Sequence, residues 1–224
     1  MTSPAGAPWA EGLSLVCHEL RRPLTVIRGA ATLLMEAHDQ LPPDKRAQIL
    51  GLIDQSARTM ADLVDDLALV ARMQAGLVQV APQTVRVAEL VDAAVDAVRE
   101  RNPQVRLTLP LPGEIAVEAD REQSVRVLVA LISAAVQRSP EGSAPELSVE
   151  ASGAQVRILV VLAAGAAIEE PAERGSEPFS SSDGYLRLPL YLSRGLARLM
   201  SGEVAAITLP GGRSAFSFNL NRRV

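Results

Sequence analysis

Apolar residues recur at alternating spacings of three and four over the first 75 residues, which predicts two amphipathic helices. The first is expected from about residue 10 to residue 38, with an apolar seam at Leu13, Val16, Leu20, Leu24, Ile27, Ala31 and Leu34. The second is expected from about Asp44, which can cap it, to Ala75, with a strict heptad at Ile49, Ile53, Ser56, Met60, Leu63, Leu67 and Val70. Two helices alone do not cover two seams. The pattern therefore predicts a homodimeric four-helix bundle.

The period changes beyond a predicted linker at residues 76–84, which contains Gly76 and Pro82. Helical spacing is expected at 88–100, 121–138 and 190–200, and strand-like runs at 105–109, 147–151, 156–161, 204–209 and 215–220. This alternation predicts an α+β domain over residues 85–224, with helices on one face of a mixed sheet. The domain order is then a disordered N-terminus at 1–9, a helical hairpin at 10–75, the linker, and the α+β domain.

Composition narrows the class of partner. The chain has 224 residues, with 22 Lys and Arg against 26 Asp and Glu, a formal net charge of −4, which argues against nucleic acid. The longest apolar run, residues 158–168, is about half as long as a bilayer-spanning helix, and no leader precedes it, so we expect a cytoplasmic protein without membrane insertion. A single cysteine, Cys17, excludes an internal disulfide, and no Cys/His cluster has metal-ligand spacing.

The residues that promise chemistry lie on the first predicted helix. The stretch Cys17-His18-Glu19-Leu20-Arg21-Arg22-Pro23-Leu24-Thr25-Val26-Ile27 sets one histidine beside an acid, two arginines and a proline. His18 lies off the apolar seam and is expected to face water. The stretch closely resembles the H-box of two-component sensor histidine kinases, whose histidine carries phosphate. It departs from that motif only at Arg22, which stands where the family has threonine or asparagine.

The resemblance extends over nearly the whole chain. It implies a dimerization and phosphoacceptor domain followed by a Bergerat-type ATP-binding domain, with Ser139-Pro140, an F-box at Glu177-Pro178-Phe179 and a closing hairpin after Ser201-Gly202-Glu203. The resemblance also implies that the family's nucleotide-binding residues are replaced in this chain. Alanine stands at the two asparagine positions, Ala130 and Ala134, and at the position of the adenine-binding aspartate, Ala163. The three glycines of the lid are replaced by Tyr185, Arg187 and Pro189.

These replacements remove the groups that hold ATP. A methyl group offers no oxygen to magnesium or to an adenine amino group, and proline has no amide proton for a phosphate. We therefore expect no cofactor and no metal of the chain's own, with Mg²⁺ supplied only by a partner receiver domain.

A histidine without ATP can still exchange phosphate with an aspartyl phosphate, which is an acyl phosphate of high transfer potential. His18 is the expected nucleophile, and Glu19 is a candidate to orient the ring or handle its proton. Arg21, Arg22, Pro23 and Thr25 are expected to contact phosphate or an acidic receiver surface, and Pro23 is also expected to bend the helix beside the acceptor. Arg22 is too long and wrongly charged for the water-positioning role that the family's Thr or Asn has in phosphatase activity.

The main hypothesis is a histidine phosphotransferase that passes phosphoryl groups between His18 and receiver-domain aspartates, in plan like dimeric histidine phosphotransferases of bacterial phosphorelays. Expected partners are a second copy of the chain, response-regulator receiver domains and an upstream histidine kinase. One alternative is a sensor histidine kinase with residual or partner-dependent ATP autophosphorylation. Another is a non-catalytic pseudokinase adaptor that binds response regulators.

Overall fold

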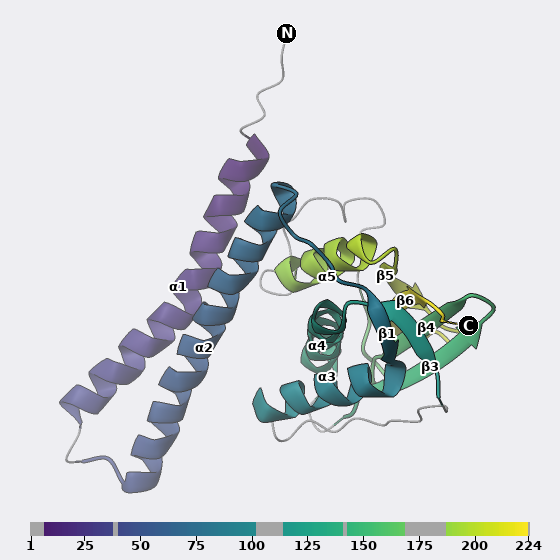
Figure 1. Ribbon diagram of the computed structural model, residues 1–224. Coiled ribbons are helices and arrows are strands. Elements are labelled where there is room, and N and C mark those ends of the chain that lie inside the picture. The colour runs from purple at the N-terminus through teal and green to yellow at the C-terminus, as the bar shows by residue number, and fades with distance from the viewer. Residues whose placement is uncertain (1–6, 38–39, 102–113, 141–142, 169–186, 224) are drawn as a thin grey trace. The chain divides into compact units, whose positions relative to one another are not determined.

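The structure is a computed structural model that describes residues 7–37, 40–101, 114–140, 143–168 and 187–223 (Figure 1). The chain forms two compact units. The first contains residues 1–76 with 177–188, and the second contains residues 77–176 with 189–224. The predicted strand at 105–109, the F-box, Tyr185 and His38 lie outside the described residues.

The first unit is a hairpin of two long helices, α1 (Ala7–Glu36) and α2 (Pro43–Gln74). The helix α2 begins one residue before the predicted cap, with Pro42 at the N-cap position and no side-chain cap hydrogen bond. The prediction that Asp44 caps the helix was therefore wrong. The fixed φ of Pro43 suits a first helical position, which moves Asp44 into the first turn, where its carboxylate faces the positive end of the helix dipole.

The inner face of the hairpin follows the predicted heptad of α2. Ile49, Leu63 and Val70 are buried, and the remaining heptad positions are partly buried, namely Ile53, Ser56, Met60 and Leu67. Other apolar side chains stay uncovered in the single chain, namely Leu24 (45% exposed), Val26, Leu33 and Met35 on α1, and Leu50, Leu52 and Val64 on α2. One hairpin therefore does not bury its own apolar surface.

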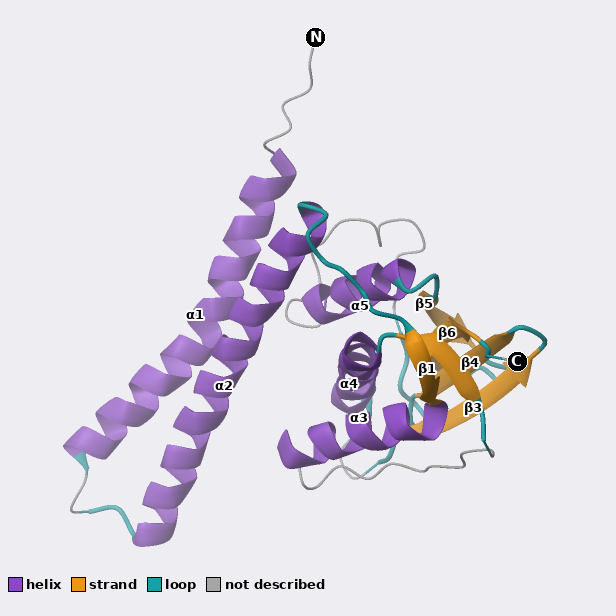
Figure 2. Ribbon diagram, viewed as in Figure 1, coloured by secondary structure: helices purple, strands orange, loops and turns teal. Residues whose placement is uncertain are grey.

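The second unit is built on an antiparallel sheet. Its strands are β1 (Gln83–Arg86), β2 (Ala116–Ala119), β3 (Glu146–Ser152), β4 (Gln155–Val161), β5 (Glu203–Thr208) and β6 (Ser214–Asn221). Four of them form a sheet in the order β3-β4-β6-β5, and β1 pairs with β2. The helices are α3 (Val87–Arg101), α4 (Arg121–Arg138) and α5 (Arg187–Leu199), and they cover one face of the sheet (Figure 2).

The observed elements bear out a helical hairpin followed by an α/β sheet domain. Every pairing among the described strands is antiparallel, where a mixed sheet was predicted. The strands β1 and β2 were not predicted, and β1 begins within the predicted linker. Both have only four residues, too few for the alternation of apolar and polar side chains to stand out.

The core of the second unit lies between the helices and the sheet. Its largest fully buried side chains include Leu90, Leu128, Leu131, Ile132, Ile158, Leu159, Phe218 and Leu220. Two hydrogen bonds to one carboxylate fix the start of α4. The Asp120 carboxylate caps α4 by accepting from the Gln123 amide at 3.0 Å, and its second oxygen accepts from the Ala81 amide at 2.9 Å.

A tight approach closes the end of α5. Ser201 adopts a left-handed φ of 56°, and the Gly202 amide donates to the Ala197 carbonyl at 2.8 Å. A Cβ on Gly202 would lie 2.5 Å from the Asn219 carbonyl oxygen, so only glycine fits between α5 and β6. In the described part of the chain, no helix has both the length and the apolar character that a bilayer span requires.

Candidate functional site

The candidate nucleophile, His18, lies on α1, and its side chain is exposed. Arg21, Arg22 and Thr25 follow on the next two turns and are also exposed. The Thr25 hydroxyl donates to the Arg21 carbonyl at 2.8 Å, an i to i−4 bond along the same helix. An exposed imidazole on a rigid helix has what a phosphoryl acceptor needs, namely access for a partner protein and a fixed direction of approach.

Glu19 and Pro23 lie on a different side of α1. The Glu19 side chain is only 7% exposed, and Pro23 is buried one turn later. Neighbouring residues on a helix point about 100° apart, so Glu19 follows the packed side of the helix while His18 follows the open side. A role for Glu19 in orienting the ring or handling its proton stays a prediction.

Pro23 does not end the helix. The helix α1 continues through it to Glu36, although proline cannot donate the hydrogen bond that would reach the Glu19 carbonyl. The predicted bend and its effect on His18 stay predictions.

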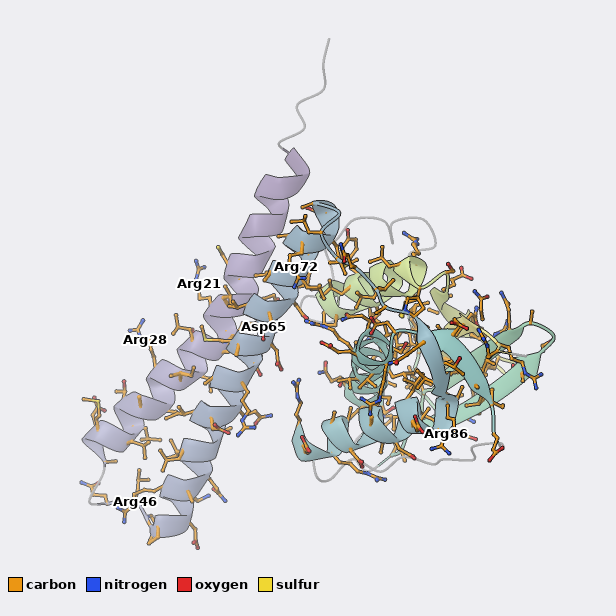
Figure 3. All side chains as sticks on the ribbon, viewed as in Figure 1. Arg21, Arg28, Arg46, Asp65, Arg72 and Arg86 are labelled. Atoms are coloured by element: carbon orange, nitrogen blue, oxygen red, sulfur yellow. The ribbon has the colours of Figure 1, made fainter. Side chains whose placement is uncertain are left out.

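The surface around His18 carries positive charge. Arg21, Arg22 and Arg28 are exposed, and none forms an ion pair with another residue that the structure describes. Figure 3 shows the side chains of Arg21 and Arg28 directed away from α2. This arrangement suits an anionic ligand or an acidic protein surface.

Of the positions expected to have lost their nucleotide contacts, Ala130, Ala134, Ala163 and Pro189 lie in the second unit. Ala134 (1% exposed) and Ala130 (half-buried) are on α4, and Ala163 (7% exposed) follows β4. Arg187 is the first residue of α5, and Pro189 lies in the first turn of that helix. The missing amide of Pro189 costs α5 nothing, because the first amides of a helix have no partner inside the helix.

Protein groups tie this region together. The Ser139 hydroxyl donates to the Ala135 carbonyl at 2.7 Å and accepts from the Ala163 amide at 3.4 Å, which links the end of α4 to the segment after β4. The turn that follows is closed by the Ala166 amide, which donates to the Ala163 carbonyl at 3.1 Å. The backbone at Ala163 is thus held by one hydrogen bond to the end of α4 and by one within its own turn.

Two arginines make further contacts between elements of this region. The Arg138 guanidinium lies 5.7 Å from the centre of the Phe216 ring, a cation–π distance, and donates to the Ala134 carbonyl at 3.3 Å. Arg213 donates to the Glu146 carboxylate at 3.0 Å and to the Leu162 carbonyl at 3.2 Å. Sequence reasoning missed both arginines, because their partners lie on other elements and no local spacing marks them.

The remaining charged groups that the structure describes do not form a metal site. Among the described residues, no group of three or more His, Cys, Asp or Glu side chains could hold a metal ion. Arg194 and Arg198 lie four residues apart on α5. Burial lowers the pKa of Arg194, and the neighbouring charge of Arg198 lowers it further.

Known proteins match this chain in its helical hairpin and over nearly its whole length. Residues 11–76 match the His Kinase A (phospho-acceptor) domain. The histidine protein kinase DivJ of Caulobacter vibrioides is 29% identical over 223 residues, which cover 94% of this chain and 37% of DivJ. The chain thus spans little more than a third of the length of that relative.

Solved structures share the fold. The histidine kinase AdeS of Acinetobacter baumannii superposes with a TM-score of 0.67 at 20% identity, over 92% of this chain and 98% of the other. A complex of the histidine kinase ThkA with the response regulator protein TrrA superposes with a TM-score of 0.67 at 19% identity, over 94% of this chain and 61% of the other. The likeness covers the hairpin and the α/β unit together.

Proposed function

We propose, from the premise that this chain carries the core of a two-component sensor histidine kinase, that His18 accepts phosphoryl groups from receiver-domain aspartates and returns them. The observation that carries the proposal is the exposed His18 on α1 of a phosphoacceptor hairpin, joined to a domain with alanine at the expected nucleotide contacts. The chain then works as a phosphotransferase in a phosphorelay.

The transfer step needs little from this chain. A neutral imidazole nitrogen attacks the phosphorus of an aspartyl phosphate, a nitrogen–phosphorus bond forms, and the phosphorus–oxygen bond to the carboxylate breaks. The carboxylate leaves with its electron pair, and the ring loses its N–H proton to solvent. The receiver supplies Mg²⁺ and the acidic pocket, so positioning is the main task of α1.

Two copies of the chain are part of the proposal. The uncovered apolar side chains of α1 and α2, including Leu24 (45% exposed) on the predicted seam of α1, would be buried in a four-helix bundle. A receiver partner is supported by the complex of ThkA with its response regulator. We place the protein in the cytoplasm, where an upstream histidine kinase could load that receiver.

A second candidate function is autophosphorylation of His18 from ATP. The name of DivJ as a histidine protein kinase, and the match over nearly the whole chain, favour it. Against it stand the buried methyl groups of Ala134 and Ala163, which cannot replace the oxygens of asparagine and aspartate. A partner kinase that supplies the nucleotide site would reconcile the two observations.

The test uses receiver domains from the same genome, each labelled on its aspartate with a small-molecule phosphodonor. We expect at least one receiver to pass label to the wild-type chain and none to pass it to a His18→Ala variant. The same chains are incubated with labelled ATP and Mg²⁺. Label from ATP alone that depends on His18 would establish the kinase, and receiver binding without transfer would leave only an adaptor.

A further inference from the structure

We infer that Arg21 and Arg22 together clamp the phosphoryl group on His18, so that Arg22 stabilises the phosphorylated state of this chain. The inference rests on the proposed function and deepens it. It concerns how the phosphate is held once it is on the ring, whatever donor placed it there.

Helix geometry brings both guanidinium groups to the imidazole. Residues three and four positions on lie about 60° to one side and about 40° to the other, and rise about 4.5 and 6 Å along the axis. Side chains on a helix lean toward its N-terminus and cover the turn before their own Cα. Arg21 and Arg22 therefore lean back over the turn that carries His18, one on each side of the ring.

The polar residues closest to His18 in sequence do not compete with the arginines for a phosphate on the ring. Glu19, the acid nearest in sequence, is 7% exposed and lies on another side of the helix. The Thr25 hydroxyl spends its single proton on the Arg21 carbonyl, so it has none to donate to a phosphate. Neither Arg21 nor Arg22 is paired with an acid among the described side chains. Two exposed cations thus follow His18 one turn later on α1.

A phosphoryl group on the ring supplies the missing anion. It carries up to two negative charges and three acceptor oxygens, and the planar guanidinium fork matches two of them. With threonine at position 22 this second fork would be absent. The doubly charged form of the phosphoryl group is therefore favoured in this chain, and the pH midpoint of its titration is lowered.

We expect phosphoramidate to load the 224-residue chain without any partner protein. An imidazole nitrogen of His18 attacks the phosphorus, the bond to the donor nitrogen breaks, ammonia leaves with the electron pair, and the ring proton passes to water. The ³¹P resonance of the phosphohistidine is then followed against pH, and its decay is followed at fixed pH. A His18→Ala variant identifies the resonance.

The matched variants are Arg22→Thr and Arg28→Thr. Each removes one exposed arginine from α1, but Arg28 lies about 15 Å along the axis from His18, beyond the screening length at physiological salt. We expect Arg22→Thr to raise the midpoint by about 0.15 to 0.7 pH units, the range for an exposed charge pair, and Arg28→Thr to raise it by less than half of that. Added salt should shrink the Arg22 effect, and Arg22→Lys should restore part of it.

Equal shifts for Arg22→Thr and Arg28→Thr would overturn the clamp, because general charge alone would then explain them. An unchanged midpoint in Arg22→Thr would also overturn it. Failure of the proposed function is a separate outcome, in which phosphoramidate loads His18 and the arginine effect holds, yet no receiver exchanges phosphate with the chain.

Discussion

The two units of this chain treat polar and apolar side chains in opposite ways. The hairpin keeps its reactive group, His18, in solvent and leaves Leu24 and Met35 uncovered. The α/β unit buries most of its large apolar side chains and has alanine where nucleotide contacts were expected, at Ala134 and Ala163. The difference teaches that a fold survives on its apolar core alone, while its chemistry depends on a few polar atoms that the core does not need.

The largest expected effect is the loss of phosphoryl acceptance when the hairpin loses His18. His18→Ala should abolish phosphoryl acceptance from every donor and leave the free energy of unfolding within about 0.5 kcal/mol of wild type, because the side chain is exposed. Phosphate incorporation and urea unfolding measure the two quantities. His38→Ala is the control and should accept phosphate normally. Incorporation into His18→Ala at the wild-type level would place the chemistry elsewhere.

The α/β unit should respond in the opposite sense. Phe218→Ala removes a fully buried ring and should lower the free energy of unfolding by about 3–5 kcal/mol, while phosphoramidate still loads His18 in the folded chain. Urea denaturation followed by circular dichroism measures the loss. Leu199→Ala is the control, because Leu199 is 43% exposed and should lose less than about 1 kcal/mol. Loss of phosphate acceptance in folded Phe218→Ala would join the two units functionally.

A charge on the uncovered apolar face of the hairpin should weaken self-association of the chain. Leu24→Glu places a carboxylate in the proposed dimer contact and should weaken self-association at least tenfold, roughly 1.4 kcal/mol. Sedimentation equilibrium measures it. Thr32→Glu adds the same charge on the same helix at an exposed position off the seam and should leave association unchanged. Equal dissociation constants for the two variants would remove Leu24 from the interface.

A smaller loss of stability than that of Phe218→Ala is expected at the start of α4, where its cap also contacts the chain that enters the α/β unit. Asp120→Ala removes the acceptor for both Gln123 and Ala81 and should cost about 1–2 kcal/mol of unfolding free energy. Glu122→Ala, an exposed acid in the first turn of α4, should cost less than half as much. Thermal or urea unfolding of both variants measures the two losses. Equal losses for Asp120→Ala and Glu122→Ala would contradict a stabilising role for the two hydrogen bonds of Asp120.

Much of the architecture was predictable because local signals agreed. The helix α4 was predicted at 121–138 and is observed there, since Asp120 caps its start and Pro140 follows its end. The heptad of α2 is its inner face. The antiparallel pairing of every described strand was not foreseen, because pairing depends on partners far along the chain.

The site was predictable in part. The H-box spacing singled out His18, and the structure bears out its exposure. The burial of Glu19 was not foreseen, because a one-residue step on a helix separates an open face from a packed one only where the partner helix is known. The contacts of Arg138 with Phe216 and of Arg213 with Glu146 join distant elements, so no spacing could have indicated them.

The most direct test measures the source of the phosphate on His18. The wild-type chain is given labelled ATP with Mg²⁺ in one reaction and a labelled phospho-receiver in another, and label on His18 is quantified over time. The account predicts label from the receiver and none above the His18→Ala background from ATP. Stoichiometric label from ATP alone would contradict it and make the chain an autonomous kinase.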